Sequence, residues 1–301
     1  MDMVLRLAGV SHRFGAVEVL RDVDLDLPAG TVTALVGPDG AGKTTLLRVA
    51  AGVLTPAAGR VERPGDAGIG YLAGASSVYP DLTVWENLTF FGRLYGMNGR
   101  ALAAEAGRLL AWAGLEAFRH RPARHLSGGM RQKLALACAL IHRPAVALLD
   151  EPTTGVDPVA RRELWALLDQ LAAGGMAVLV ATPYMDEAGR CRRVALLHRG
   201  RLLAAGSPEE LRARVPCRVL LLQAEGRRQE LLRLARELPG VQDARPAGEG
   251  VRVALPVGAP DPTLPPGVRA VPAEVELEDV YVWLAGELAG KEPAGKEEAR
   301  A

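Results

Sequence analysis

The chain has 301 residues, with 36 lysines and arginines against 35 aspartates and glutamates, and a formal net charge of +1. Its length allows one large domain or two smaller ones, and the near-zero charge does not suggest a nucleic-acid partner. The three cysteines, Cys138, Cys191 and Cys217, lack C-x-x-C spacing, so we interpret them as buried thiols in a reducing cytoplasm.

The first part of the chain predicts short strands joined by turns. Strands are expected at 4–10, 23–27 and 31–36, with a loop at 12–15 and a turn at 28–30. The start Met1-Asp2-Met3 does not resemble a signal peptide, and no apolar run is long enough to span a bilayer. We therefore expect a soluble protein, and any membrane-spanning part would belong to another polypeptide.

The stretch that follows the third strand fits the phosphate-binding pattern G-x-x-x-x-G-K-[ST]. A helical pattern follows it until Gly52, so the loop lies where a strand turns into a helix, and its backbone N–H groups would face a phosphate. We predict that Lys43 reaches the β- and γ-phosphates and that the Thr44 hydroxyl binds Mg²⁺. The alternative is a plain glycine-rich turn. The predicted loop residues are Gly37, Pro38, Asp39, Gly40, Ala41, Gly42, Lys43, Thr44 and Thr45.

The middle of the chain alternates predicted helices and strands. A capping box at Thr83–Glu86 opens a helix that ends at Leu94, and a second capping box begins at Ser207. Further helices are expected at 101–113, 128–141 and 158–173, and strands at 69–72, 146–149, 177–181, 194–197 and 201–205, with a turn at 55–59.

Two carboxylates, Asp150 and Glu151, follow the all-apolar strand at 146–149. Open α/β sheets bind ligands at the carboxyl ends of their strands. Asp150 is therefore predicted to hold Mg²⁺, directly or through water, and Glu151 to polarise an attacking water as general base. Such a strand end is more often a solvated turn, but its pairing with the loop at Gly37 favours the functional interpretation.

The stretch Leu126–Met130 opens another helix, with Ser127 as a good N-cap before Gly128 and Gly129. An exposed helix N-terminus is a second phosphate-binding device. One nucleotide cannot contact two separate helix ends unless something brings them together. A head-to-tail dimer does this, with Ser127, Gly128 and Gly129 of one copy closing over the γ-phosphate held by the other. A simple capped helix is the alternative for this motif taken alone.

The character of the chain changes near Val215-Pro216. Strands at 218–222, 241–244 and 251–255, helices at 227–238 and 277–288, and a proline-rich loop at 256–267 are expected. We predict a nucleotide-binding domain at 1–214 with a helical subdomain at about 75–143, a small α+β appendage at 215–289, and a disordered tail at 290–301.

In this order, the motifs resemble those of the ATP-binding cassette (ABC) ATPase family over Met1 to about Arg214. The resemblance assigns Gly37–Thr45 to Walker A, Leu126–Met130 to the signature, Val146–Glu151 to Walker B with the catalytic glutamate, and Gly155–Asp157 to the D-loop. It implies an α/β P-loop NTPase fold with a mixed sheet and a helical subdomain, ATP and Mg²⁺ as cofactors, and a nucleotide-sandwich dimer. It also implies that Phe14 stacks on adenine, with a buried strand-end phenylalanine as the alternative.

Within that family, Tyr79–Leu88, Thr153–Pro158 and the appendage resemble the ATPases of ABC-2-type multidrug exporters. The phrase Gly37–Gly40 resembles the first cassette of tandem-cassette exporters. The resemblance implies an ATPase subunit at the inner face of the cell membrane, partnered by an integral membrane permease and a second cassette, in a hetero- or homodimer. Drugs or lipophilic compounds are the expected cargo. The alternatives are a regulatory, hydrolytically weak cassette paired with an active one, and a soluble ABC ATPase acting on ribosomes or DNA.

Three departures from the family pattern stand out. Gly74 occupies the position of the Q-loop glutamine, Pro183 that of the switch histidine, and the segment 59–69 is shorter than the family's usual arm. We therefore predict reduced hydrolysis. The aromatic helix has two interpretations, plain core or a groove for a membrane subunit, and we favour the groove for Trp85 and Tyr95.

Overall fold

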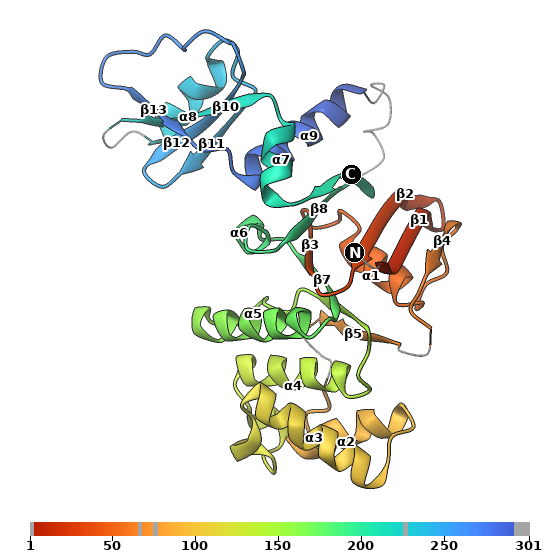
Figure 1. Ribbon diagram of the computed structural model, residues 1–301. Helices are drawn as coiled ribbons and strands as arrows, with labels where there is room; N and C mark the ends of the chain where they lie inside the picture. Colours follow the sequence, from red (N-terminus) through yellow and green to blue (C-terminus); the bar gives the residue numbers. More distant parts are fainter. Residues whose placement is uncertain (1–2, 66–67, 75–77, 225–227, 292–301) are drawn as a thin grey trace. The chain divides into compact units, whose positions relative to one another are not determined.

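The computed structural model of the chain describes residues 3–65, 68–74, 78–224 and 228–291 (Figure 1). The chain divides into two compact units, Met1–Ala205 and Gly206–Ala301. The sequence placed the boundary after Arg214, whereas the short helix α7 (Pro208–Arg214) packs on α9 (Leu277–Lys291) inside the second unit.

Two sheets form the first unit within the described residues. A six-stranded sheet has the order β5-β6-β7-β3-β8-β9, and a three-stranded sheet has the order β2-β1-β4. The bounds of the central sheet are β3 (Val32–Val36), β5 (Ile69–Ala73), β6 (Val146–Asp150), β7 (Ala177–Thr182), β8 (Arg193–His198) and β9 (Arg201–Gly206). Every residue of β3, β6 and β7 is buried, as expected for apolar parallel strands covered on both faces. This α/β arrangement confirms the predicted fold class.

The three-stranded sheet differs from the prediction in two places. The loop expected at His12–Gly15 is wrong, because β1 (Met3–Phe14) runs on to a tight turn at 15–16 and pairs Phe14 with Val17 of β2 (Val17–Pro28). The sequence also missed β4 (Ala58–Glu62), where Gly59 signals a turn. Gly59 instead permits a close backbone approach, since a Cβ there would lie 2.2 Å from the carbonyl oxygen of Gly9.

Helices of the first unit match the predicted positions closely. Their bounds are α1 (Lys43–Ala50), α2 (Val84–Leu94), α3 (Gly99–Ala113), α4 (Gly128–Leu140), α5 (Pro158–Ala173) and the unpredicted single turn α6 (Met185–Ala188). The capping box at Thr83 is present. Helices α2, α3 and α4 pack against one another (Figure 1). In the described part of the chain, no helix combines the length and apolar character needed to cross a membrane.

The second unit is a separate α+β structure, as predicted. Its described strands are β10 (Cys217–Gln223), β11 (Asp243–Ala247), β12 (Gly250–Pro256) and β13 (Arg269–Ala273), in the order β11-β12-β10-β13. Helix α8 (Arg228–Glu237) packs on β11 and β12. Strand β13 was missed because it lies at the sheet edge with mostly exposed side chains and contains Pro272. Helix α9 reaches Lys291, so the predicted tail is helical at 290–291, and 292–301 lie outside the described residues.

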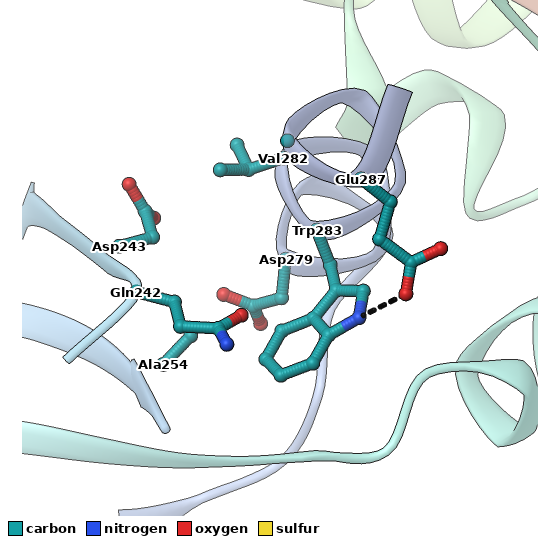
Figure 2. Close-up of a pocket in the computed structure, with 8 residues that line it drawn as sticks. Gln242, Asp243, Ala254, Asp279, Val282, Trp283 and Glu287 are labelled. Carbon is teal, nitrogen blue, oxygen red and sulfur yellow. Dashed lines mark hydrogen bonds between the residues drawn. The ribbon is translucent and has the colours of Figure 1, made fainter. Parts of the chain in front are cut away.

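Helix α9 is anchored by the buried carboxylate of Asp279. Asp279 accepts hydrogen bonds from the guanidinium groups of Arg245 and Arg252 and from the backbone N–H of Glu276 at 2.7 Å. Beside it lies a cavity of about 360 Å³, where the indole N–H of Trp283 donates to Glu287 at 3.1 Å (Figure 2). The Asp279 carboxylate, which lines this cavity, is therefore already paired with two arginines.

All three cysteines are buried free thiols, as the sequence predicted. Burial raises the pKa of Cys138, and it raises the pKa of Cys191 to about 12, so these thiols stay protonated at neutral pH. They are packing residues.

Candidate functional site

Parallel pairing brings the predicted functional segments to one edge of the central sheet. Val36, the last residue before the glycine-rich loop, pairs with Thr182, and Asp150 pairs with Ala181. The carboxyl ends of β3, β6 and β7 therefore lie side by side, although the sequence separates them widely. This is the edge at which open α/β sheets bind ligands.

The loop between β3 and α1 depends on glycine at several positions. Gly40 and Gly42 have φ values of 76° and 105°, in the left-handed region that side chains other than glycine's rarely adopt. A Cβ on Gly37 would lie 2.2 Å from the carbonyl oxygen of Leu197. The glycine pattern is therefore required by the path of the backbone, which forms the concave cradle typical of phosphate sites.

Lys43 is held inside this cradle, with only 5% of its surface exposed. Its ammonium donates to the carbonyl oxygens of Gly37 at 2.7 Å and Pro38 at 3.1 Å, and lies 3.9 Å from the Asp39 carboxylate. A buried cation at the inner side of a backbone loop fits an anionic ligand.

Thr44 and Asp150 meet at the base of the loop. The Thr44 hydroxyl donates to Asp150 Oδ1 at 3.2 Å. Burial raises the pKa of the Asp150 carboxyl, the Thr44 hydrogen bond opposes this, and the nearby Glu151 charge adds to it. A hydroxyl and a carboxylate are the oxygen ligands that Mg²⁺ prefers, so this pair fits the predicted metal position.

Glu151 has a φ of 49°, which is uncommon for a residue other than glycine. Its backbone N–H donates to Ala181 O at 2.9 Å, and its side chain accepts from the Thr154 hydroxyl at 3.2 Å. The strained backbone brings Glu151 to the wall of a cavity of about 200 Å³. This cavity is lined by Val19, Asp39, Gly40, Ala41, Gly42, Lys43, Thr44, Thr45 and Glu151.

The Ser-Gly-Gly motif lies elsewhere in the unit. Ser127 caps α4, and its hydroxyl accepts from the Met130 N–H at 3.2 Å. Gly129 permits close packing on α5, because a Cβ there would lie 2.5 Å from the Ala160 Cβ. Among the described residues, neither Ser127 nor its two glycines lines the cavity at the loop. Within one chain, the structure therefore leaves the two predicted phosphate-binding ends apart.

Phe14 is 48% exposed, and its ring meets the ring of His12 edge-on at 4.8 Å. The alternative of a buried strand-end phenylalanine is therefore wrong. Val19, which lines the cavity, was missed, because a valine that belongs to no motif and no expected strand carries no signal of a binding role. A Cβ on Gly42 would lie 3.0 Å from the carbonyl oxygen of Val19, so β2 walls the loop.

Two of the three departures from the family pattern lie at strand ends. Gly74, with a φ of 53°, directly follows β5, whose last residue Ala73 pairs with Asp150. Pro183 directly follows the last residue of β7. Both positions therefore adjoin the strands that carry the predicted site, and neither offers a side-chain hydrogen-bonding group.

The aromatic helix α2 is partly covered. The Arg119 guanidinium lies 3.5 Å from the Trp85 ring centroid, and the Tyr95 ring stacks on His142 at 3.7 Å. Tyr95 is nevertheless 51% exposed. Of the two residues favoured for a groove, Tyr95 presents the larger open surface, and the groove stays a prediction.

Comparisons with known proteins agree with this geometry. The family model described as "ABC transporter" matches residues 20–154. The chain is 43% identical over 268 residues to the probable multidrug ABC transporter ATP-binding protein YbhF of Escherichia coli (strain K12), covering 84% of this chain but only 46% of that protein. It is 34% identical over 303 residues to the Nod factor export ATP-binding protein I of Cupriavidus metallidurans, covering 95% and 98%. A solved structure of an ATP-binding subunit of an ABC transporter superposes with a TM-score of 0.63 at 29% identity, covering 70% of this chain and 92% of the other.

Proposed function

Because this chain belongs to the ABC transporter family of ATP-binding proteins, we propose that it binds Mg-ATP and is the ATP-binding subunit of an exporter. One observation carries the proposal. Lys43, Thr44 and Glu151 line the same cavity, and the Thr44 hydroxyl donates to Asp150. A cation for the phosphates, a hydroxyl–carboxylate pair for Mg²⁺ and a general base thus converge at one strand edge.

Each residue then has a defined task. The loop N–H groups and Lys43 bind the β- and γ-phosphates, and Thr44 and Asp150 hold Mg²⁺, whose charge offsets that of the phosphate oxygens. Glu151 orients a water molecule and accepts its proton as that water attacks. Phe14, exposed beside the turn of the β1–β2 hairpin, offers an aromatic face to adenine.

Hydrolysis by this chain is proposed to be slow. Pro183 has no side-chain donor or acceptor, and Gly74 has no side chain at all, at positions where the family carries histidine and glutamine. Loss of one preorganised group of this kind typically costs about 10²–10³-fold in rate. The same two residues favour the alternative of a regulatory cassette that pairs with an active one.

The proposed assembly is a head-to-tail pair of cassettes with a membrane permease at the cytoplasmic face of the membrane. Ser127, Gly128 and Gly129 lie away from the cavity of their own chain, which favours their use on the nucleotide of a partner. The relatives support an export role, since one is named a probable multidrug transporter protein and another a Nod factor export protein. Lipophilic compounds such as drugs are the proposed cargo, and the cassette is proposed to be the first unit, Met1–Ala205.

The test is equilibrium binding of a fluorescent ATP analogue with Mg²⁺. Lys43→Ala removes the cation of the loop and should weaken binding by about 10- to 100-fold, the range for a hydrogen bond to a charged group. Lys133→Ala is the matched control, because Lys133 lies on α4 in an ion pair with Glu163. Equal affinities of the Lys43→Ala protein and the parent would refute the proposed site.

A further inference from the structure

The buried carboxylate of Glu187, on the single turn α6, contacts three separate segments near the proposed site: the loop after Glu151, the end of β7 and the first turns of α5. Its Oε2 accepts from the Thr153 hydroxyl at 2.9 Å and from the Thr182 hydroxyl at 2.8 Å. Glu187 is 3% exposed, and both threonines are fully buried. Thr153 lies in the loop after Glu151, and Thr182 ends β7 immediately before Pro183.

The other oxygen of this carboxylate is not satisfied in the same way. Glu187 Oε1 lies 3.6 Å from Arg161 Nε, and neither buried atom has a hydrogen-bond partner among the described residues. Arg161 is one turn beyond Asp157, the N-cap of α5 and the last residue of the D-loop. The contact of Glu187 with Arg161 is therefore an ion pair without a hydrogen bond, at a distance that a small shift of α5 would close to one. Arg161 also lies 5.3 Å from the Tyr184 ring centroid.

A short path connects this carboxylate to the general base. Thr153 is bonded to Glu187, and the next residue, Thr154, donates to Glu151 at 3.2 Å. The backbone of Glu151 is also tied to β7 through Ala181. The strained backbone of Glu151 is thus held directly by Ala181, and the loop that follows it is held by the Thr153–Glu187 bond.

We propose that Glu187 is a positioning residue for ATP hydrolysis, which holds the Glu151 loop in register with the end of β7 and with the start of α5. This rests on the proposed function for its effect on rate. Because Pro183 cannot anchor the β7 end through its own side chain, that anchoring falls to the Thr182–Glu187 bond. Misplacing a catalytic group by about 1 Å can cost about 10²-fold in rate without a change in ligand binding.

The experiment uses the full chain with Glu187→Gln, Thr153→Val and Thr153→Ser, measuring single-turnover hydrolysis, ATP-analogue affinity and amide hydrogen exchange. The matched control is Glu105→Gln, which alters another buried, arginine-paired carboxylate, on α3 and away from the cavity. We expect Glu187→Gln and Thr153→Val to lower the rate by about 10- to 100-fold with affinity within about twofold of the parent. Thr153→Ser keeps the hydroxyl and should restore the rate.

Hydrogen exchange tests, without any nucleotide, whether Glu187 holds the Glu151 loop and the end of β7. Losing one buried hydrogen bond should speed exchange of residues 150–156 and 182–184 by about 5- to 10-fold in the Glu187 and Thr153→Val proteins, but not in Glu105→Gln. If exchange speeds up but the rate per folded molecule matches that of the Glu105→Gln control, Glu187 is merely structural and the proposal is overturned. If exchange also matches the control, Glu187 does not hold the loop, and the proposal is overturned as well. If the parent fails to bind ATP, the proposed function fails, and the exchange comparison still decides the role of Glu187. If Glu187→Gln does not fold, the Thr153→Val and Thr153→Ser pair decides it.

Discussion

The Thr44 hydroxyl lies 3.2 Å from Asp150 Oδ1, although 106 residues separate the two in the chain. The contact exists because β3 and β6 are both paired with β7 in parallel, which brings the start of α1 to the end of β6. It joins the loop motif to the strand-end carboxylate at the place where a divalent cation would bind.

Asp150→Asn should raise the thermal stability of the protein at neutral pH while it weakens nucleotide binding. Burial raises the pKa of this carboxyl above the ordinary value of 3.8, so the folded state binds a proton more readily than the unfolded state. Stability therefore falls as pH rises from that value through the folded-state pKa, and the full cost is present at neutral pH. We expect the asparagine variant to have a higher melting temperature than the parent at pH 7. The difference should vanish below pH 3.8, where the carboxyl is protonated in both the folded and the unfolded state.

The same variant should lose affinity for the nucleotide in the presence of Mg²⁺, by about 10- to 100-fold if the carboxylate acts on the ion directly or through water. Binding of the analogue measured with and without Mg²⁺ checks this. An asparagine protein that binds Mg-ATP like the parent would contradict the proposed metal role of Asp150.

Glu105 should show the opposite pH dependence. Burial alone would raise the pKa of its carboxyl, but hydrogen bonds from Arg108 and Arg143 prevail and lower it below 4.5. A depressed folded-state pKa gives stability that is present above pH 4.5 and is lost as pH falls through the folded-state pKa. Glu105→Gln should therefore melt lower at pH 7 and show a flatter acid limb, as thermal unfolding between pH 3 and 7 would reveal.

Local motifs explain how much of the site was predictable. The loop from Gly37 to Thr45 and the strand end at Asp150 are contiguous patterns with mechanical reasons for each residue type. The loop between β3 and α1 and the end of β6 lie where the sequence predicted them, and their binding roles stay predictions. Burial of Phe14 could not be decided, because exposure at a hairpin end depends on the short turn after β1.

Contacts between segments far apart in the chain could not be predicted from sequence patterns. The bond between Thr153 and Glu187 spans 34 residues, and no periodicity marks either residue as a partner. Strand β4 was hidden because Gly59 is a turn signal locally, while its role is close approach to Gly9. In both cases a tertiary contact, absent from any short window, determines what the residue does.

The parent chain should hydrolyse ATP well below about 10 s⁻¹, the median for ordinary enzymes. Pro183→His supplies a side-chain donor and acceptor at the end of β7 and should raise the rate, by up to about 10²-fold if that group alone is limiting. Gly74→Gln should help less, because the φ of 53° at this position strains any side-chain-bearing residue. Single-turnover measurements on both variants test this ranking. An unchanged rate in Pro183→His would show that Pro183 is not the cause of slow hydrolysis.

Two variants, each expected to affect a different ATP site of the dimer, test the pairing of this chain with a different cassette. Gly74 and Pro183 follow β5 and β7 at the sheet edge that carries the chain's own proposed site, whereas the Ser127 helix end is intact and could complete a fully equipped site on a partner. Ser127→Arg places a long cation at that helix end and should abolish ATPase of the assembled transporter, while Glu151→Gln should reduce it only slightly, because the fast site lies on the partner chain. Ser207→Arg is the matched control, since Ser207 caps α7 in the same way outside the cassette edge. The reverse ranking in co-purified complexes, or full activity of a transporter built on this cassette alone, would rule out the asymmetric arrangement.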